Sequence, residues 1–219
     1  MKITKILAMA LMVGLLAACG PVESLHPLFE PKDRIEMPAL VGGWIGVDEE
    51  NGIELTIEAE GDKTYEIVLT GDDENKKTTH FRGEFGRVGD FVFLDVYTDS
   101  KAIGDAPAVP VHQFFQVKVA GDSLELAYMD DGMLTREIQE GRTRIAHKIL
   151  GQSILLTAPT KDLQVLALEY VKEAEALRLS MTTMQNPSTW VQYTKETRAL
   201  FVLLSLRFRR LSAAPAEEF

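Results

Sequence analysis

Residues 53–70, IELTIEAEGDKTYEIVLT, contain two runs of alternating apolar and polar residues on either side of a short turn. Ile53, Leu55 and Ile57 supply the apolar positions of the first run, and residues 65–69 repeat the pattern after the turn. A period of two places the apolar side chains on one face of a strand, and a Gly-Asp pair favours a tight connection. This stretch therefore predicts a β-hairpin with one buried face.

Similar runs continue along the chain. Residues 91–97 are apolar on both faces except at Asp95, which indicates a central strand. Glycine and aspartate clusters separate the runs, and Asp130-Asp131-Gly132 is one of the predicted turns. Further strands are expected at 115–119, 124–128, 143–150 and 153–157. We therefore expect residues 41–157 to form an antiparallel β-barrel or half-barrel of about eight strands.

The pattern becomes helical after residue 158. Thr160 is positioned to cap a helix over residues 160–180, and Asp162 lies in its first turn. Residues 188–211 also keep helical spacing of apolar side chains and carry four arginines towards their end. Those arginines either offset the helix dipole or meet a membrane surface or an acidic partner. The predicted class is α+β, with one or two C-terminal amphipathic helices within 158–211 packing on the β domain, followed by a disordered tail at 212–219.

The N-terminus has the features of a secretion signal. Lys2 and Lys5 precede an uncharged apolar run, residues 6–18, which is too short to span a bilayer comfortably. The residues Leu16-Ala17-Ala18-Cys19 resemble the lipobox of bacterial lipoproteins. The alternative is an ordinary signal peptide followed by a chance cysteine. The chain as a whole resembles bacterial lipoproteins to which no function is assigned.

The lipobox resemblance implies how the protein is anchored. Residues 1–18 would be removed as a signal peptide, the thiol of Cys19 would carry diacylglycerol, and the new amino group would carry an acyl chain such as palmitate. Two or three acyl chains hold a protein at a membrane where one would not. Gly20 stands where an aspartate commonly retains such proteins at the inner membrane. The expected location is therefore the outer membrane, facing the periplasm, in a host with two membranes.

Four prolines between residues 20 and 40 predict an extended tether, so that residues 19–40 are expected to link the lipid to the domain. Without residues 1–18, the chain has 21 basic and 33 acidic residues, a formal charge of −12. This acidity argues against general nucleic-acid binding. Cys19 is the single cysteine, which excludes internal disulfides and cysteine-ligated zinc.

Gly42-Gly43-Trp44 opens the β domain. A Gly-x-Trp at the start of the first strand is similar to the lipocalin signature, and a helix after the barrel is also lipocalin-like. In that family the tryptophan closes one end of the barrel and an arginine near the last strand packs on it, so the resemblance implies that role for Arg142 or Arg144. The alternative is simply a buried tryptophan on a first strand.

No catalytic motif is present. The sequence lacks Gly-x-Ser-x-Gly, His-Glu-x-x-His and glycine-rich phosphate loops, and no two of its four histidines have metal-ligand spacing. Asp95 and His112 each interrupt an aromatic, strand-like run, and a buried polar group there needs a partner. We expect no metal and no cofactor, and we interpret Asp95 and His112 as a structural hydrogen-bonded pair or as two exposed residues; the remote alternative is a hydrolase that uses them for acid–base chemistry.

The leading functional hypothesis is a non-enzymatic, envelope-anchored binding domain. One version binds a small apolar ligand in a cup that six phenylalanines line, although the same rings would also fill a solid core; they are Phe81, Phe85, Phe91, Phe93, Phe114 and Phe115. The other version is an accessory subunit of an envelope complex that docks through the C-terminal basic amphipathic helix.

Overall fold

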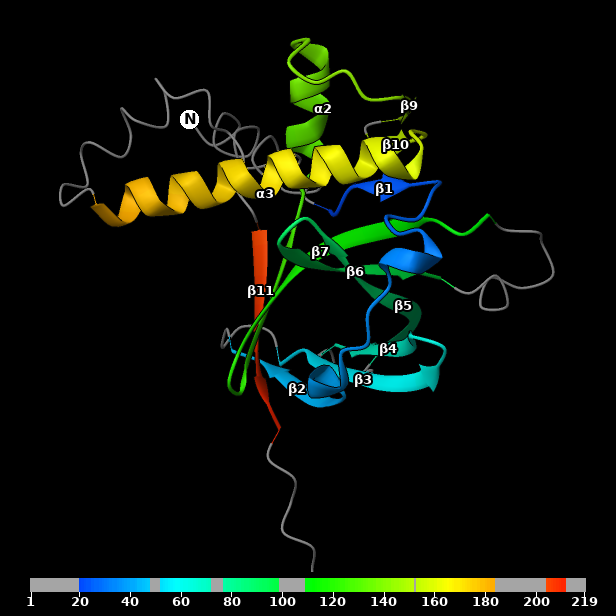
Figure 1. Cartoon of the computed structure of the whole chain (residues 1–219), viewed down its shortest axis with the longest axis vertical. Coiled ribbons are helices and arrows are strands. Elements are labelled where there is room, and N and C mark those ends of the chain that lie inside the picture. The colour runs from blue at the N-terminus through cyan, green and yellow to red at the C-terminus, as the bar shows by residue number, and fades with distance from the viewer. Residues whose placement is uncertain are drawn as a thin grey trace, which may run out of the picture.

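The computed structural model describes residues 20–47, 52–71, 77–98, 109–151, 153–183 and 204–211. Within these residues, eight antiparallel strands close into a barrel (Figure 1). Around the barrel the order is β2, β3, β4, β5, β6, β7, β8 and β11, and β11 pairs with β2 to complete the ring. The strands are β2 (Gly42–Gly46), β3 (Glu54–Gly61), β4 (Thr64–Thr70), β5 (Thr78–Val88), β6 (Phe91–Tyr97), β7 (His112–Ala120), β8 (Ser123–Tyr128) and β11 (Leu204–Arg210). The predicted antiparallel barrel is confirmed, in its closed form.

The predicted hairpin at 53–70 forms β3 and β4. Leu55 lies opposite Leu69 and Ile57 lies opposite Ile67, so the alternation points one apolar row into the barrel. Gly61 has a φ of 101° at the turn, a conformation that glycine adopts without strain. The buried residues of the barrel interior are Leu40, Trp44, Leu55, Ile57, Tyr65, Ile67, Phe85, Leu94, Val96, Val117, Leu124, Leu126 and Phe208.

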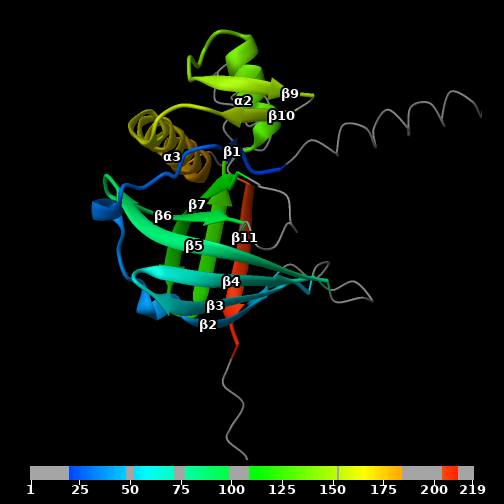
Figure 2. The ribbon, with the colours of Figure 1, turned by 90° about the vertical axis from the view of Figure 1, so that its right-hand side faces the viewer.

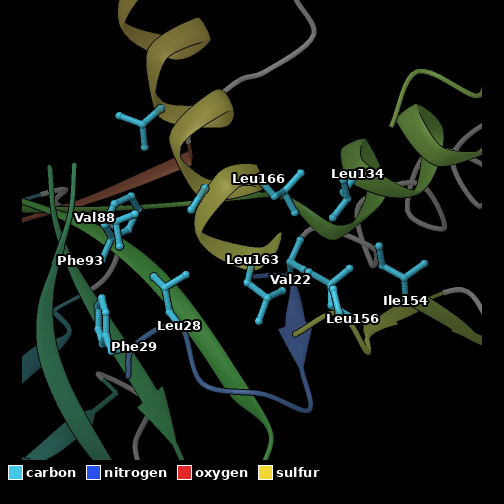
Figure 3. Close-up of a cluster of buried hydrophobic side chains, with 13 residues drawn as sticks. Val22, Leu28, Phe29, Val88, Phe93, Leu134, Ile154, Leu156, Leu163 and Leu166 are labelled. Carbon is cyan, nitrogen blue, oxygen red and sulfur yellow. The ribbon is translucent and has the colours of Figure 1, made fainter. Parts of the chain in front are cut away.

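A second layer covers the outer face of β6, β7 and β8 at one end of the barrel (Figures 1 and 2). Strand β1 (Glu23–Ser24) pairs with the start of β7, β10 (Ser153–Leu156) lies parallel to β1, and β9 (His147–Leu150) is the outermost strand. Helices α2 (Asp131–Gln139) and α3 (Thr160–Thr183) complete the layer. Its apolar core, drawn in Figure 3, comprises Val22, Leu28, Phe29, Val88, Phe93, Leu134, Ile154, Leu156, Ala158, Leu163, Leu166, Ala167 and Val171.

Residues 20–40 are part of the fold, so the prediction of a tether across 19–40 is wrong for this stretch. Val22, Leu28 and Phe29 are buried in the second core, and Leu40 is buried in the barrel. The Phe29 ring occupies the space where a side chain on residue 86 would lie, since a Cβ built on Gly86 would be 2.4 Å from Phe29 Cδ1. Pro31 and Pro38 each begin a short 3-10 turn, η1 (Pro31–Asp33) and η2 (Pro38–Leu40), and the apolar side chains of the segment pack on the rest of the fold.

The prediction of a helix over 188–211 is wrong for residues 204–210, which form β11. Leu206 is opposite Leu126 on β8, and Phe208 is opposite both Leu124 on β8 and Gly46 on β2. Phe208 is buried in the barrel, whereas Arg207 and Arg209 are exposed, which is the alternation of a strand. The rest of the predicted helix, residues 188–203, and the predicted tail at 212–219 lie outside the described residues.

Residues 129–157 also differ from the prediction. The expected turn at Asp130-Asp131-Gly132 begins α2, because the Asp130 side chain caps the helix by accepting a hydrogen bond of 2.8 Å from the Met133 amide. The two strands expected at 143–150 and 153–157 are present as β9 and β10. They lie in the second layer and not in the barrel.

The predicted helix over 160–180 is confirmed as α3. Its buried face packs on the second core, with Leu163, Leu166, Ala167, Tyr170, Val171 and Ala174. Thr160 is not the cap that was predicted; it is the first helical residue, and its hydroxyl donates to the Pro27 carbonyl at 2.8 Å. No helix within the described ranges is both long enough and apolar enough to cross a membrane.

Candidate functional site

The predicted pair of Asp95 and His112 is in contact. His112 Nδ1 lies 2.9 Å from Asp95 Oδ1, and the two side chains come from adjacent strands, β6 and β7, on the outer face of the barrel. The Leu28 amide donates to the other carboxylate oxygen at 2.8 Å. Asp95 is 1% exposed because the N-terminal segment covers it. The pair therefore fastens residues 26–30 to the barrel wall.

Two further charged residues extend this pair into a cluster. Glu84 on β5 lies directly opposite Asp95 on β6, and both are buried. Like charges opposite one another in a sheet repel, so each buried carboxylate needs a polar partner. Arg34 Nε lies 2.8 Å from Glu84 Oε2, as His112 lies beside Asp95. We call Arg34, Glu84, Asp95 and His112 the polar cluster.

Sequence reasoning missed Glu84 and Arg34. Glu84 carries the same signal that pointed to Asp95, since it is a charged residue flanked by Gly83 and Phe85. Arg34 carries no comparable signal, because it lies in a polar stretch whose position against β5 depends on the whole fold. Burial raises the pKa of both carboxyls: Arg34 and His112 oppose the rise at Glu84, and His112 and the Leu28 amide oppose it at Asp95.

A serine lies next to the pair, as the hydrolase alternative would require. Ser24 is opposite His112 in the pairing of β1 with β7. However, the Ser24 hydroxyl donates to the His26 carbonyl at 2.9 Å and accepts from the His26 amide at 3.1 Å, and Ser24 is fully buried. Nucleophilic catalysis needs the hydroxyl within reach of both the base and a substrate. The arrangement supports a structural role for Ser24, Asp95 and His112.

Trp44 is buried in the barrel interior, and its indole Nε1 donates to the Leu40 carbonyl at 3.0 Å. The arginine over its ring is Arg210 on β11, with Cζ 4.5 Å from the ring centroid. The assignment of this role to Arg142 or Arg144 is therefore wrong. Both precede β9 in the second layer, and Arg142 is paired with Glu137 at 2.5 Å and with Glu140. The last strand does supply the arginine, but that strand was not recognised in the sequence.

The six phenylalanines do not line one cavity. Phe85 is buried inside the barrel with Phe81 and Phe115 packed against that core, whereas Phe93, Phe91 and Phe114 belong to the core outside the barrel wall. Under α3 there is a small apolar cavity of about 20 Å³, which Gln116 and Tyr170 help to line. That volume suits a single water molecule, and ligand pockets usually have several hundred Å³.

A wider groove lies between α3 and residues 142–145. Two adjoining hollows, of about 250 Å³ and 410 Å³, share Arg142, Thr143, Leu166 and Glu169 among their lining residues. We call this the α3 groove. Arg144 lines one wall and Glu169 the other, and neither has an ion-pair partner among the described residues. Val165 of α3, which is 55% exposed, also lines the larger hollow.

Cys19 lies outside the described residues, which begin at the next residue, Gly20. Among the residues that the structure describes, no group of three or more histidine, aspartate or glutamate side chains is arranged to hold a metal ion. No protein family, curated protein or solved structure matches this chain.

Proposed function

We propose that this protein is an exported lipoprotein whose acylated Cys19 holds it at the envelope membrane, and whose domain binds a partner protein without catalysing a reaction. The lipobox supports the anchoring step. The proposed location is the outer membrane, facing the periplasm, in a host with two membranes.

The packing of the barrel favours a protein partner over a small apolar ligand. Large side chains such as Trp44, Phe85 and Phe208 are fully or almost fully buried inside the barrel. The cavity under α3 has room for little more than a water molecule, so a ligand there would require α3 to move. The basic residues 204–210 do not form a docking helix, because they are a strand of the barrel.

In this proposal the partner protein binds at the α3 groove. Its apolar residues Ile145, Val165 and Leu166 line it together with positive and negative side chains, Arg142, Arg144, Asp162 and Glu169. Interfaces combine an apolar centre with complementary charges at the rim. The groove therefore suits a segment of a partner protein that presents an aliphatic or aromatic side chain between an acidic and a basic residue. In an envelope complex, this would make the chain an accessory subunit.

We expect Cys19→Ser to move the protein from the membrane fraction to the soluble fraction of the envelope. The sulfur is the attachment point for diacylglycerol, and an acidic domain has little other attraction for anionic lipid. Fractionation with immunoblotting measures the change, and intact mass analysis of the wild type should reveal acyl chains on a polypeptide that begins at Cys19. An unacylated chain, or unchanged fractionation of the variant, contradicts lipid anchoring.

We expect Val165→Glu to abolish most of the partner binding. A carboxylate at the centre of the α3 groove would be desolvated against Leu166 on docking and would repel an acidic partner residue. The measurement is quantitative mass spectrometry of proteins that co-purify from gently solubilised membranes. Val119→Glu on β7 is the matched control, since Val119 is also an exposed valine and lies outside the groove. Equal recovery of the same proteins with both variants argues against docking at this groove.

A further inference from the structure

The N-terminus of the described chain is fixed to the second layer from its first residue. The Gly20 carbonyl accepts a hydrogen bond of 3.0 Å from the Asp131 amide, and the Val22 amide donates to the Met129 carbonyl, also at 3.0 Å. Val22 is buried. Consecutive Cα atoms are about 3.8 Å apart, so Cys19 lies within one such step of a fixed residue. An acyl chain on Cys19 would therefore hold this part of the domain against the membrane with almost no slack.

Asp131 connects Gly20 to β10, the strand that pairs with the outermost strand β9. Its side chain accepts from the Ile154 amide at 3.1 Å, at the start of β10, while its own amide donates to Gly20. On the far side of β10, Ile149 of β9 is opposite Ile154, and Leu150 is opposite Ser153. Neighbouring strands are about 4.8 Å apart, so these two residues lie one strand beyond the β10 residue that Asp131 holds. In Figure 2 the end of β9 and the start of the blue chain lie at the same end of the molecule.

The end of β9 is unusually apolar for an exposed surface. Ile149 is 63% exposed and Leu150 is 55% exposed, and no further strand pairs with β9 among the described residues. An exposed edge strand is normally protected by charge, by proline or by a covering element. Here Lys148 is the one charged residue of the strand's exposed end, next to two large aliphatic side chains. We call Lys148, Ile149 and Leu150 the β9 tip.

We propose that the β9 tip enters the boundary between headgroups and acyl chains of the lipid bilayer, beside the acylated Cys19. This inference rests on the lipid anchoring proposed above. Anchoring places Cys19 at that boundary, and surface-bound apolar groups reach about 5–10 Å into it. Ile149 and Leu150 then leave water, while the Lys148 ammonium contacts lipid phosphates and its stem lies along the apolar region. The domain would stand on its second layer, with the turn between β7 and β8 directed away from the membrane.

The experiment uses the fact that Cys19 is the single cysteine of the chain. Once its sulfur is acylated, an engineered Ile149→Cys or Leu150→Cys supplies the one thiol that a nitroxide label can modify. The labelled lipoproteins are reconstituted into vesicles of phosphatidylethanolamine and phosphatidylglycerol. Val119→Cys is the control: Val119 is 40% exposed and lies six residues along β7 from Gln113, the partner of Glu23, which is about 20 Å further from the anchor.

We expect labels at 149 and 150 to show a several-fold loss of collisions with an aqueous nickel chelate and a gain of collisions with oxygen, relative to the label at 119. If one label per chain is found and positions 149, 150 and 119 are equally accessible to the chelate, the membrane-facing tip is excluded while lipid anchoring stands. If the wild-type chain itself takes up a label at Cys19, the sulfur is not acylated, and both the anchoring and the tip are overturned.

Discussion

Replacing Asp95 with alanine will lower the free energy of unfolding by about 3 kcal/mol, because one buried carboxylate satisfies the buried Leu28 amide and the partly buried His112. The Leu28 amide and His112 Nδ1 both lose their acceptor, at 2.8 Å and 2.9 Å respectively. In this variant, the free energy of local opening for the residues near Leu28 will also be lower than the free energy of unfolding for the whole domain. Urea denaturation measures the first effect, and hydrogen exchange at the Leu28 amide measures the second.

Asp95→Asn is the matched control for this prediction. The amide keeps the size of the side chain and an oxygen that can accept from Leu28, so the loss of stability will be smaller than with alanine. A change of less than about 0.5 kcal/mol for Asp95→Ala would show that the polar cluster does not hold the N-terminal segment. Faster exchange spread evenly over the chain, without a local effect at Leu28, would argue the same.

The pH dependence separates the charge of Asp95 from its hydrogen bonds. Burial raises the pKa of this carboxyl above its ordinary value of 3.8, so the folded state binds the proton more tightly than the unfolded state does. The corresponding stability is present below pH 3.8 and is lost as the pH rises through the raised folded pKa. Acidification into that window should therefore stabilise the wild type relative to Asp95→Asn.

The barrel was predictable because the sequences of its strands alternate between apolar and polar residues. The rows of β3 and β4 alternate with a period of two, and each row needs one apolar surface to pack on. The contact between Asp95 and His112 was predictable for a related reason. A polar residue inside an aromatic strand must find a partner, and the nearest polar residue in a comparable run was the correct choice.

Strand β11 could not be assigned from its own residues. Leu204 and Phe208 are four residues apart. Residues i and i+4 lie on one face of an α-helix, and they also lie on one face of a β-strand, whose side chains alternate with a period of two. The choice is made by the barrel, because β2 and β8 each present an open edge that only an eighth strand can fill. Short apolar runs are ambiguous in this way until the partner strands are known.

The packing of residues 20–40 depends on features far away in the sequence. Their prolines predict an extended chain, but Pro31 and Pro38 begin 3-10 turns, and proline content does not distinguish a free segment from a packed one. Two distant residues hold the segment in place. Gly86 leaves space for the Phe29 ring, and the Asp95 carboxylate accepts a hydrogen bond from the Leu28 amide. Each of these features is visible in the sequence only as an isolated residue.

Replacing Trp44 with alanine will cost about 4 kcal/mol of stability, more than the substitution of Asp95. The indole is fully buried, its Nε1 donates to Leu40, and its ring supports the Arg210 guanidinium. Arg210 also donates to the Val41 and Ala39 carbonyls, so the same contact joins β11 to the segment that precedes β2. The loss should therefore open the barrel at the seam where β11 closes it, which hydrogen exchange of β11 amides would detect.

A double-mutant cycle tests whether Arg210 acts through Trp44. Arg210→Ala should cost about 1 kcal/mol in the wild type and markedly less when Trp44 is already alanine, because the cation then has no ring to contact. Arg142→Ala is the control, since Arg142 pairs with Glu137 in the second layer and should be additive with Trp44→Ala. Coupling to Arg142 with additivity at Arg210 would reverse the assignment. Additivity of both arginine variants with Trp44→Ala would mean that the tryptophan stabilises the barrel through its volume and its hydrogen bond to Leu40, and not through the cation above its ring.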